Sequence, residues 1–202
     1  MVSYRFAAPQ LTPHDSQRYG LHMVPLTVEL PSQQSLTEQN LRRWKDLVSD
    51  PRLARLQERI ETDRFGHMIM SPPPSANHGS YQFRIGVLLD RYLRGGRVIT
   101  ECPISTADGV KAADVAWASP ERMRELGANS CFPHAPEICV EILSPGNTEA
   151  EIREKTALYF DAGAMEVWHC TDTGKMIFLR RGEVQTLNRS QTCPDFPAQV
   201  DL

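Results

Sequence analysis

Residues 137–143, Glu-Ile-Cys-Val-Glu-Ile-Leu, are the stretch of sequence that decides the fold. Apolar side chains occupy both alternating faces of this stretch, which is typical of a central strand covered on both sides. Glu141 interrupts the pattern, and an unpaired charge at such a position is costly to desolvate. The sequence therefore predicts a buried strand in which another group must compensate the Glu141 carboxylate.

A second short apolar strand is expected at residues 113–118, and it contains the same anomaly. Asp114 lies between the small residues Ala112 and Ala116, which leave room around its carboxylate for a ligand. If Asp114 and Glu141 face the same way on adjacent strands, they make an oxygen-rich site suited to Mg²⁺ or Mn²⁺. The alternative is a pair of structural acids, each bonded to an arginine or to the backbone.

A lysine is the third polar group at an expected buried position. The helix predicted at residues 149–162 opens with a capping box from Thr148 to Glu151 and ends at Gly163. Lys155 falls within the sheet-facing stripe of this helix, from which it could reach back over the end of the Glu141 strand. Hydrolysis of a phosphodiester needs such a cation to orient water or to stabilise developing charge. The alternative is a lysine whose stem packs on apolar surface.

The remaining pattern predicts a mixed sheet flanked by helices. Further strands are expected at residues 66–70, 97–101, 165–170 and 175–180. A first helix is predicted from a capping box at Ser35 and Glu38 to Pro51, followed by a second helical turn or two at Leu53, Leu56 and Ile60. A long helix is predicted between a cap at Ser75 or Asn77 and Gly95. Residues 1–34 contain several prolines and no periodicity, so we expect an N-terminal arm before one α/β domain at residues 35–202.

Composition narrows the class of protein. The 202 residues carry a net charge of −3, which gives no support for strong non-specific binding of nucleic acid. No apolar run reaches the roughly 18 residues that span a bilayer, and the first residues do not look like a secretory signal. The five cysteines are odd in number and have no C-x-x-C spacing, which favours free thiols in a reducing compartment. We therefore expect a cytoplasmic protein that does not bind membranes.

Several stretches together resemble the Uma-two family of restriction endonucleases, a branch of the PD-(D/E)XK nuclease superfamily. The matching stretches are MSPPPSANHG, GRVITE, ADVAWASPERM, APEICVEILSPGN and EKTALYFDAGAMEVWHC. The resemblance implies a restriction-endonuclease-like α/β fold and metal-dependent phosphodiester hydrolysis. By position, it implies that Asp114 and Glu141 are metal ligands and that Lys155 is the catalytic lysine.

Two further accessory residues are possible, and the lysine of the superfamily motif is displaced in this chain. Glu61 matches a frequent acid of the family, which implies a possible accessory role in holding a metal or water. His78, at the start of the long helix, is a second possible accessory residue that could contact substrate, and the alternative is a helix-terminal or turn histidine. The superfamily's usual E-x-K motif would place a lysine at position 143, but Leu143 stands there. The lysine is therefore assigned to position 155, on the following helix.

The leading hypothesis is a Mg²⁺- or Mn²⁺-dependent endonuclease that hydrolyses DNA. A homodimer is expected, because two sites related by a two-fold axis are the simplest way to cut both strands. The first alternative is a nuclease-like binding or regulatory module without turnover, which the acidic balance and the displaced lysine favour. The second alternative is a metal-dependent hydrolase of another phosphate ester.

Overall fold

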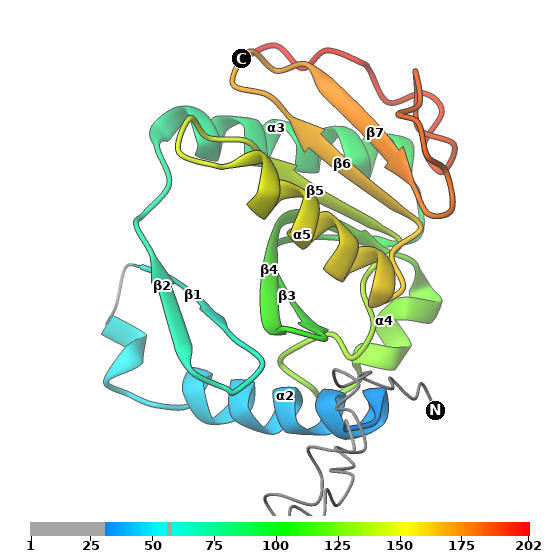
Figure 1. Cartoon of the computed structure of the whole chain (residues 1–202). Coiled ribbons are helices and arrows are strands. Elements are labelled where there is room, and N and C mark those ends of the chain that lie inside the picture. Colours follow the sequence, from blue (N-terminus) through cyan, green and yellow to red (C-terminus); the bar gives the residue numbers. More distant parts are fainter. Residues whose placement is uncertain (1–30, 56–57) are drawn as a thin grey trace, which may run out of the picture. The chain divides into compact units, whose positions relative to one another are not determined.

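The structure, a computed structural model, describes residues 31–55 and 58–202 (Figure 1). Within this part, Pro31–Leu202 form one compact unit. The arm expected at residues 1–34 lies outside the described residues except for its last four, so the division into arm and domain stays a prediction. None of the helices in the described part is long and apolar enough to cross a membrane.

Helices and short strands are interleaved along the chain. In order, they are α2 (Gln33–Val48), the 3₁₀ turn η1 (Leu53–Arg55), β1 (Arg59–Thr62), β2 (Met68–Ser71), α3 (Ala76–Tyr92), β3 (Arg97–Thr106), β4 (Gly109–Ala118), α4 (Pro120–Leu126), β5 (Ile138–Ile142), α5 (Glu149–Asp161), β6 (Glu166–Cys170) and β7 (Met176–Arg180). Five of the strands form a sheet in the order β3-β4-β5-β6-β7. Strands β5 and β6 are parallel and the other neighbours are antiparallel, while β1 and β2 form a separate antiparallel pair. The predicted mixed sheet is confirmed.

Helices cover both faces of the five-stranded sheet (Figure 1). On one face, Ile85 and Leu89 of α3 pack against Val140. On the other face, Tyr159 of α5 packs against Cys139. Ile85 and Leu89 are fully buried, and each contributes about 1.5–3 kcal/mol to stability. All five cysteines are buried and free, as the sequence predicts.

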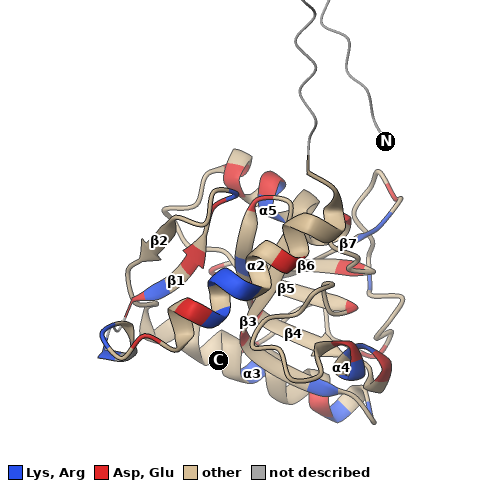
Figure 2. Cartoon of the chain, turned by 90° about the horizontal axis from the view of Figure 1, so that it is seen from below, with Lys and Arg blue, Asp and Glu red and all other residues tan. Residues whose placement is uncertain are grey.

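The first helix begins earlier than predicted, and the capping box expected at Ser35 and Glu38 is wrong. Ser32 is the N-cap, and its side chain accepts a hydrogen bond from the Ser35 backbone N–H at 3.2 Å. Gln34 donates to the Glu38 carboxylate at 3.2 Å, so this acid pairs along the helix instead of capping it. The basic residues of α2 are grouped between acidic ones along the helix (Figure 2).

The segment after α2 differs most from the prediction. A second helical turn or two was expected here, but among the described residues of this segment η1 alone is helical, and Ile60 belongs to strand β1. Leu56 lies outside the described residues. Gly66 adopts a φ of +79°, which places it in the turn between β1 and β2, so β2 starts two residues later than expected. A four-residue strand with alternating charges carries too little apolar pattern to be recognised from sequence.

The β3–β4 hairpin is also longer than predicted, at ten residues per strand. Pro103 hid this in the sequence, because proline lacks a backbone donor and is tolerated only at sheet edges. Strand β3 is the edge strand of the sheet, which explains why it accepts Pro103. The remaining expected strands agree with β5, β6 and β7 to within about a residue.

The termini of α3 and α5 agree with the sequence and position side chains discussed below. Ser75 caps α3 by accepting a hydrogen bond from the backbone N–H of His78 at 3.2 Å. The capping box from Thr148 to Glu151 is present at α5. As a result, His78 stands in the first turn of α3, and Lys155 in the second turn of α5.

Candidate active site

The two predicted acids lie on adjacent central strands. Strands β4 and β5 are antiparallel, and the paired residues nearest to the two acids are Val115 and Val140. One step further along the register brings Asp114 opposite Glu141. Both line one cavity of about 750 Å³. The expectation that they share one site is therefore met by the geometry.

Asp114 is buried and well paired. Its Oδ1 is 2.6 Å from Nη1 of Arg59, and its Oδ2 accepts a hydrogen bond from the backbone N–H of Ile142 at 2.6 Å. Nε2 of His78 lies 3.3 Å from the same Oδ2. Burial alone would raise the pKa of Asp114, but His78 and Arg59 outweigh burial and hold the pKa below its usual value. Asp114 therefore remains ionised.

Glu141 has fewer partners than its burial requires. The Tyr159 hydroxyl donates to Oε1 at 2.7 Å, and Nζ of Lys155 donates to Oε2 at 3.0 Å. Burial raises the pKa of Glu141 to about 7, and the negative charge of Asp114 adds to this rise. Near neutral pH the negative charge of Glu141 is therefore not fully compensated by these two partners, and a further cation would stabilise it.

Lys155 reaches over the end of β5, where its position on α5 predicts it. Its Nζ lies 3.0 Å from Glu141, 3.1 Å from Oε1 of Glu61 and 3.1 Å from the carbonyl oxygen of Ala112. Burial alone would lower the pKa of Lys155, but Glu141 and Glu61 raise it. The ammonium group is charged, and each of its three N–H bonds has an acceptor.

Both accessory residues also lie at this cavity. Oε1 of Glu61 accepts a hydrogen bond from the backbone N–H of Ala112 at 2.9 Å in addition to pairing with Lys155. The hydrogen bond to Asp114 raises the pKa of His78. Its Nδ1 is buried and finds no hydrogen-bond partner among the described residues. The structure thus brings together all five residues selected from the sequence.

The sequence did not reveal two charged residues of the site, Arg59 and Glu101. Arg59 lies on β1 two residues before Glu61, so both belong to one face of that strand. Its guanidinium group contacts Asp114 and the carbonyl oxygen of Ala112, and its Nε lies 3.1 Å from Glu101. Because helical turns were predicted for this segment, the alternation of side chains along a strand, which would have revealed Arg59, was not recognised. Glu101 has a φ of +48°, an irregularity that no sequence pattern indicated.

The charges and donors of this site fit a hard divalent cation. Four carboxylates, from Glu61, Glu101, Asp114 and Glu141, surround the two permanent cations of Arg59 and Lys155. Across residues 31–55 and 58–202, no group of three or more His, Cys, Asp or Glu side chains could hold a metal ion by itself. Mg²⁺ is commonly held by one or two carboxylates, with water and substrate phosphate completing its shell. A two-carboxylate site therefore suits Mg²⁺ or Mn²⁺ better than Zn²⁺.

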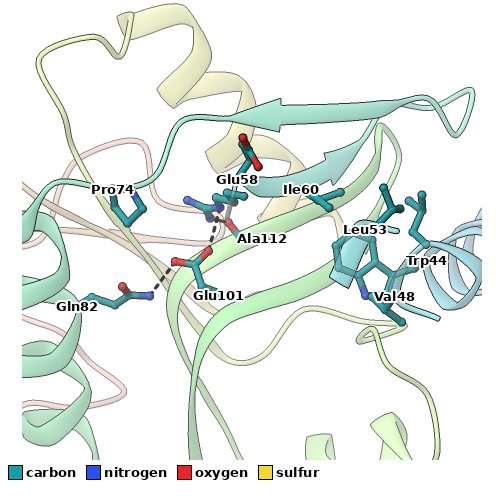
Figure 3. Close-up of a pocket in the computed structure, with 11 residues that line it drawn as sticks. Trp44, Val48, Leu53, Glu58, Ile60, Pro74, Gln82, Glu101 and Ala112 are labelled. Carbon is teal, nitrogen blue, oxygen red and sulfur yellow. Dashed lines mark hydrogen bonds and ion pairs between the residues drawn. The ribbon is translucent and has the colours of Figure 1, made fainter. Parts of the chain in front are cut away.

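A second, more apolar cavity adjoins the acidic one. It measures about 580 Å³ and is lined at one end by Trp44, Val48 and Leu53 (Figure 3). Its polar end includes Glu101, which accepts a hydrogen bond from Gln82 at 2.9 Å. Arg59, Pro74 and Glu101 line both cavities, so the guanidinium group stands at their boundary.

Fold and site together define a nuclease-like α/β protein. The chain belongs to the Uma2 family, described as "putative restriction endonuclease", whose model matches residues 46–200. The fold is similar to the crystal structure of a "putative nuclease belonging to DUF820" from Anabaena variabilis. The TM-score is 0.54 at 19% identity, over 63% of this chain and 74% of that chain. Comparison with curated proteins gave no match.

Proposed function

We propose that this protein is a Mg²⁺- or Mn²⁺-dependent endonuclease that hydrolyses phosphodiester bonds of DNA. Asp114 and Glu141 would hold the metal, with the backbone carbonyl of Ile142 as a third donor. The observation that carries the proposal is the convergence of the buried Asp114 carboxylate, the partly buried Glu141 carboxylate and Lys155 on one cavity, where desolvation leaves Glu141 with a pKa of about 7. A purely structural acid at this depth would be expected to have more partners.

Besides the two proposed metal ligands, Lys155 and His78 have distinct roles in this mechanism. The chemistry that a bound Mg²⁺ or Mn²⁺ would supply is activation of water and neutralisation of charge on the attacked phosphate. Lys155, held by Glu141 and Glu61, would orient the attacking water and stabilise negative charge. His78 would keep the Asp114 carboxylate in place through its Nε2.

A homodimer is part of the proposal, because cleavage of both DNA strands is simplest with two sites related by a two-fold axis. Analytical ultracentrifugation with and without a short duplex measures this directly. A monomer that stays monomeric on duplex DNA would limit the proposed activity to nicking.

The direct test is nicking of supercoiled plasmid in the presence of Mg²⁺ or Mn²⁺. We expect cleavage by the unchanged protein and loss of cleavage in Asp114→Asn and Glu141→Gln. Lys155→Met is expected to lose cleavage while retaining metal. Glu125→Gln is the matched control, because Glu125 forms an exposed pair with Arg122. Full activity in both acid variants would refute the assignment.

A second candidate function is a nuclease-like binding module without turnover. The observation in its favour is the ion pair of Asp114 with Arg59, since a carboxylate that already has a cation has less need of a metal. Calorimetric titration with Mn²⁺ separates the two candidates. Absence of binding at millimolar Mn²⁺, together with DNA binding, would favour the module over the enzyme.

A further inference from the structure

Arg59 occupies an unusual position for a cation at a site of this kind. Its side chain is only 18% exposed and lies between the carboxylates of Asp114, Glu61 and Glu101. Nη1 pairs with Asp114 at 2.6 Å, and Nη2 donates to the carbonyl oxygen of Ala112. Nε is buried and lies 3.1 Å from Oε2 of Glu101, although no described residue accepts a hydrogen bond from it. The guanidinium group is thus strongly attracted to the site but incompletely bonded.

The pairing of Asp114 conflicts with simultaneous metal binding. Oδ2 of Asp114 already accepts a hydrogen bond from the backbone of Ile142 and faces His78, so Oδ1 is the oxygen with fewer protein partners. Arg59 binds that oxygen. A Mg²⁺ ion coordinates a carboxylate oxygen at about 2.1 Å, which would bring it within about 5 Å of the guanidinium group. Two cations at this separation in a buried site repel strongly.

The chain supplies a reason for Arg59, and not Lys155, to move. Lys155 has an acceptor for each of its three N–H bonds, so moving it would break contacts with both Glu141 and Glu61. Nε of Arg59 lies 3.1 Å from Glu101, an acid whose side chain is 44% exposed, and Arg59 stands at the boundary of the two cavities. A planar guanidinium group matches two oxygens of a phosphate better than an ammonium group does.

We infer that Arg59 and the divalent cation exchange on Asp114, and that the released guanidinium group binds a phosphate of the DNA strand. This inference rests on the proposed function. Arg59 is then a phosphate-binding residue that also neutralises Asp114 until metal arrives. Its removal should have opposite effects on two affinities, whereas a purely structural arginine would weaken both.

The first measurement is Mn²⁺ affinity by calorimetry at pH 8, where Glu141 is ionised. Arg59→Met is expected to bind Mn²⁺ about tenfold more tightly than the unchanged protein, because one competing charged hydrogen bond is gone. Arg64→Met is the matched control, since Arg64 belongs to the same hairpin, is 58% exposed and pairs with Asp108. It should leave Mn²⁺ affinity unchanged.

The second measurement is the affinity for a short DNA duplex by fluorescence anisotropy, with Ca²⁺ in place of Mg²⁺. Arg59→Met is expected to weaken binding about tenfold, Arg59→Lys to restore part of the loss, and Arg64→Met to have less effect. Unchanged or weaker Mn²⁺ binding by Arg59→Met would overturn the exchange while leaving the proposed function intact. Absence of Mn²⁺ binding by both the unchanged protein and Arg59→Met would remove the proposed function itself.

Arg59→Met could fail to fold, and a measurement on the unchanged protein covers that case. The side-chain N–H signals of Arg59 can be followed by NMR during Mg²⁺ titration and assigned with Arg59→Lys. We expect faster solvent exchange of the Nη protons on saturation, because the contact with Asp114 is released. Metal binding without any change in these signals would refute the exchange.

Discussion

Glu141 and Glu166 are glutamates with little exposure to solvent on adjacent parallel strands, yet their surroundings are opposite. Glu166 is fully buried and accepts hydrogen bonds from Trp168, Ser190 and Thr192, with the backbone N–H of Gln191 as a further donor. Burial alone would raise its pKa, but these donors bring the pKa below the usual value. Such a carboxylate holds the C-terminal segment against β6 and has no need of another partner.

Among the described residues, one hydroxyl and one ammonium group donate to the Glu141 carboxylate, and its pKa is raised to about 7. Low exposure to solvent is therefore common to both glutamates and does not explain the difference between them. The number of donors does, because unmatched negative charge is what a metal ion can neutralise. If this distinction is correct, substitutions at the two positions must affect different properties of the protein.

The largest expected effect is on activity at Glu141. Glu141→Gln should lower plasmid cleavage at least about a thousandfold, about 4 kcal/mol of transition-state stabilisation, because a proposed metal ligand is lost. Its thermal midpoint should stay equal or rise. Glu166→Gln, assayed at a temperature where it is folded, should keep its cleavage rate. Equal loss of activity in both variants would break the comparison.

The next effect is on stability at Glu166. Glu166→Gln should lower the free energy of unfolding by about 3 kcal/mol, because its amide group turns an N–H toward donors that need an acceptor. Urea denaturation followed by tryptophan fluorescence measures this. Glu137→Gln is the control, since the Glu137 carboxylate accepts a hydrogen bond from the backbone N–H of Ser119. A loss of stability no greater than in this control would show that the donors around Glu166 are not needed.

The sequence reveals one of these two glutamates and not the role of the other, for a physical reason. Glu141 interrupts an apolar strand, so local alternation is enough to find it, and Asp114 and Lys155 stand out in the same way. The partners of Glu166 come from residues 190–192, which follow no periodic pattern and meet β6 only through the fold. Arg59 was missed because its short strand contains too few apolar residues to be separated from helix.

The pH dependence of stability should have opposite signs at the two glutamates. The pKa of Glu141 is raised from 4.5 to about 7, so between these values the native protein holds a proton that the unfolded chain has lost. The free energy of unfolding should therefore fall as pH rises through this window, by about 3 kcal/mol relative to Glu141→Gln. The pKa of Glu166 is lowered, so its contribution is present above the ordinary pKa and is lost as pH falls.

This dependence is measured by urea denaturation of the unchanged protein and Glu141→Gln at intervals from pH 5 to pH 8. The difference between the two proteins removes titrations that they share. A difference that stays constant over this range would mean that Glu141 is ionised throughout. Its ionisation would then resemble that of Glu166, contrary to the comparison drawn above.

The smallest effect tests whether one donor shifts Glu141 further from the behaviour of Glu166. Tyr159→Phe removes the hydroxyl that donates to Oε1, which should raise the pKa of Glu141 and destabilise its ionised form by about 1–2 kcal/mol. At pH 7 the variant should bind Mn²⁺ several-fold more weakly, and at pH 9 the difference should shrink because Glu141 is ionised in both proteins. Tyr81→Phe is the control, since that hydroxyl donates to the Asp172 carbonyl oxygen away from the acids. If the variant instead binds Mn²⁺ more weakly by the same factor at both pH values, Tyr159 shapes the metal site without acting through the charge of Glu141.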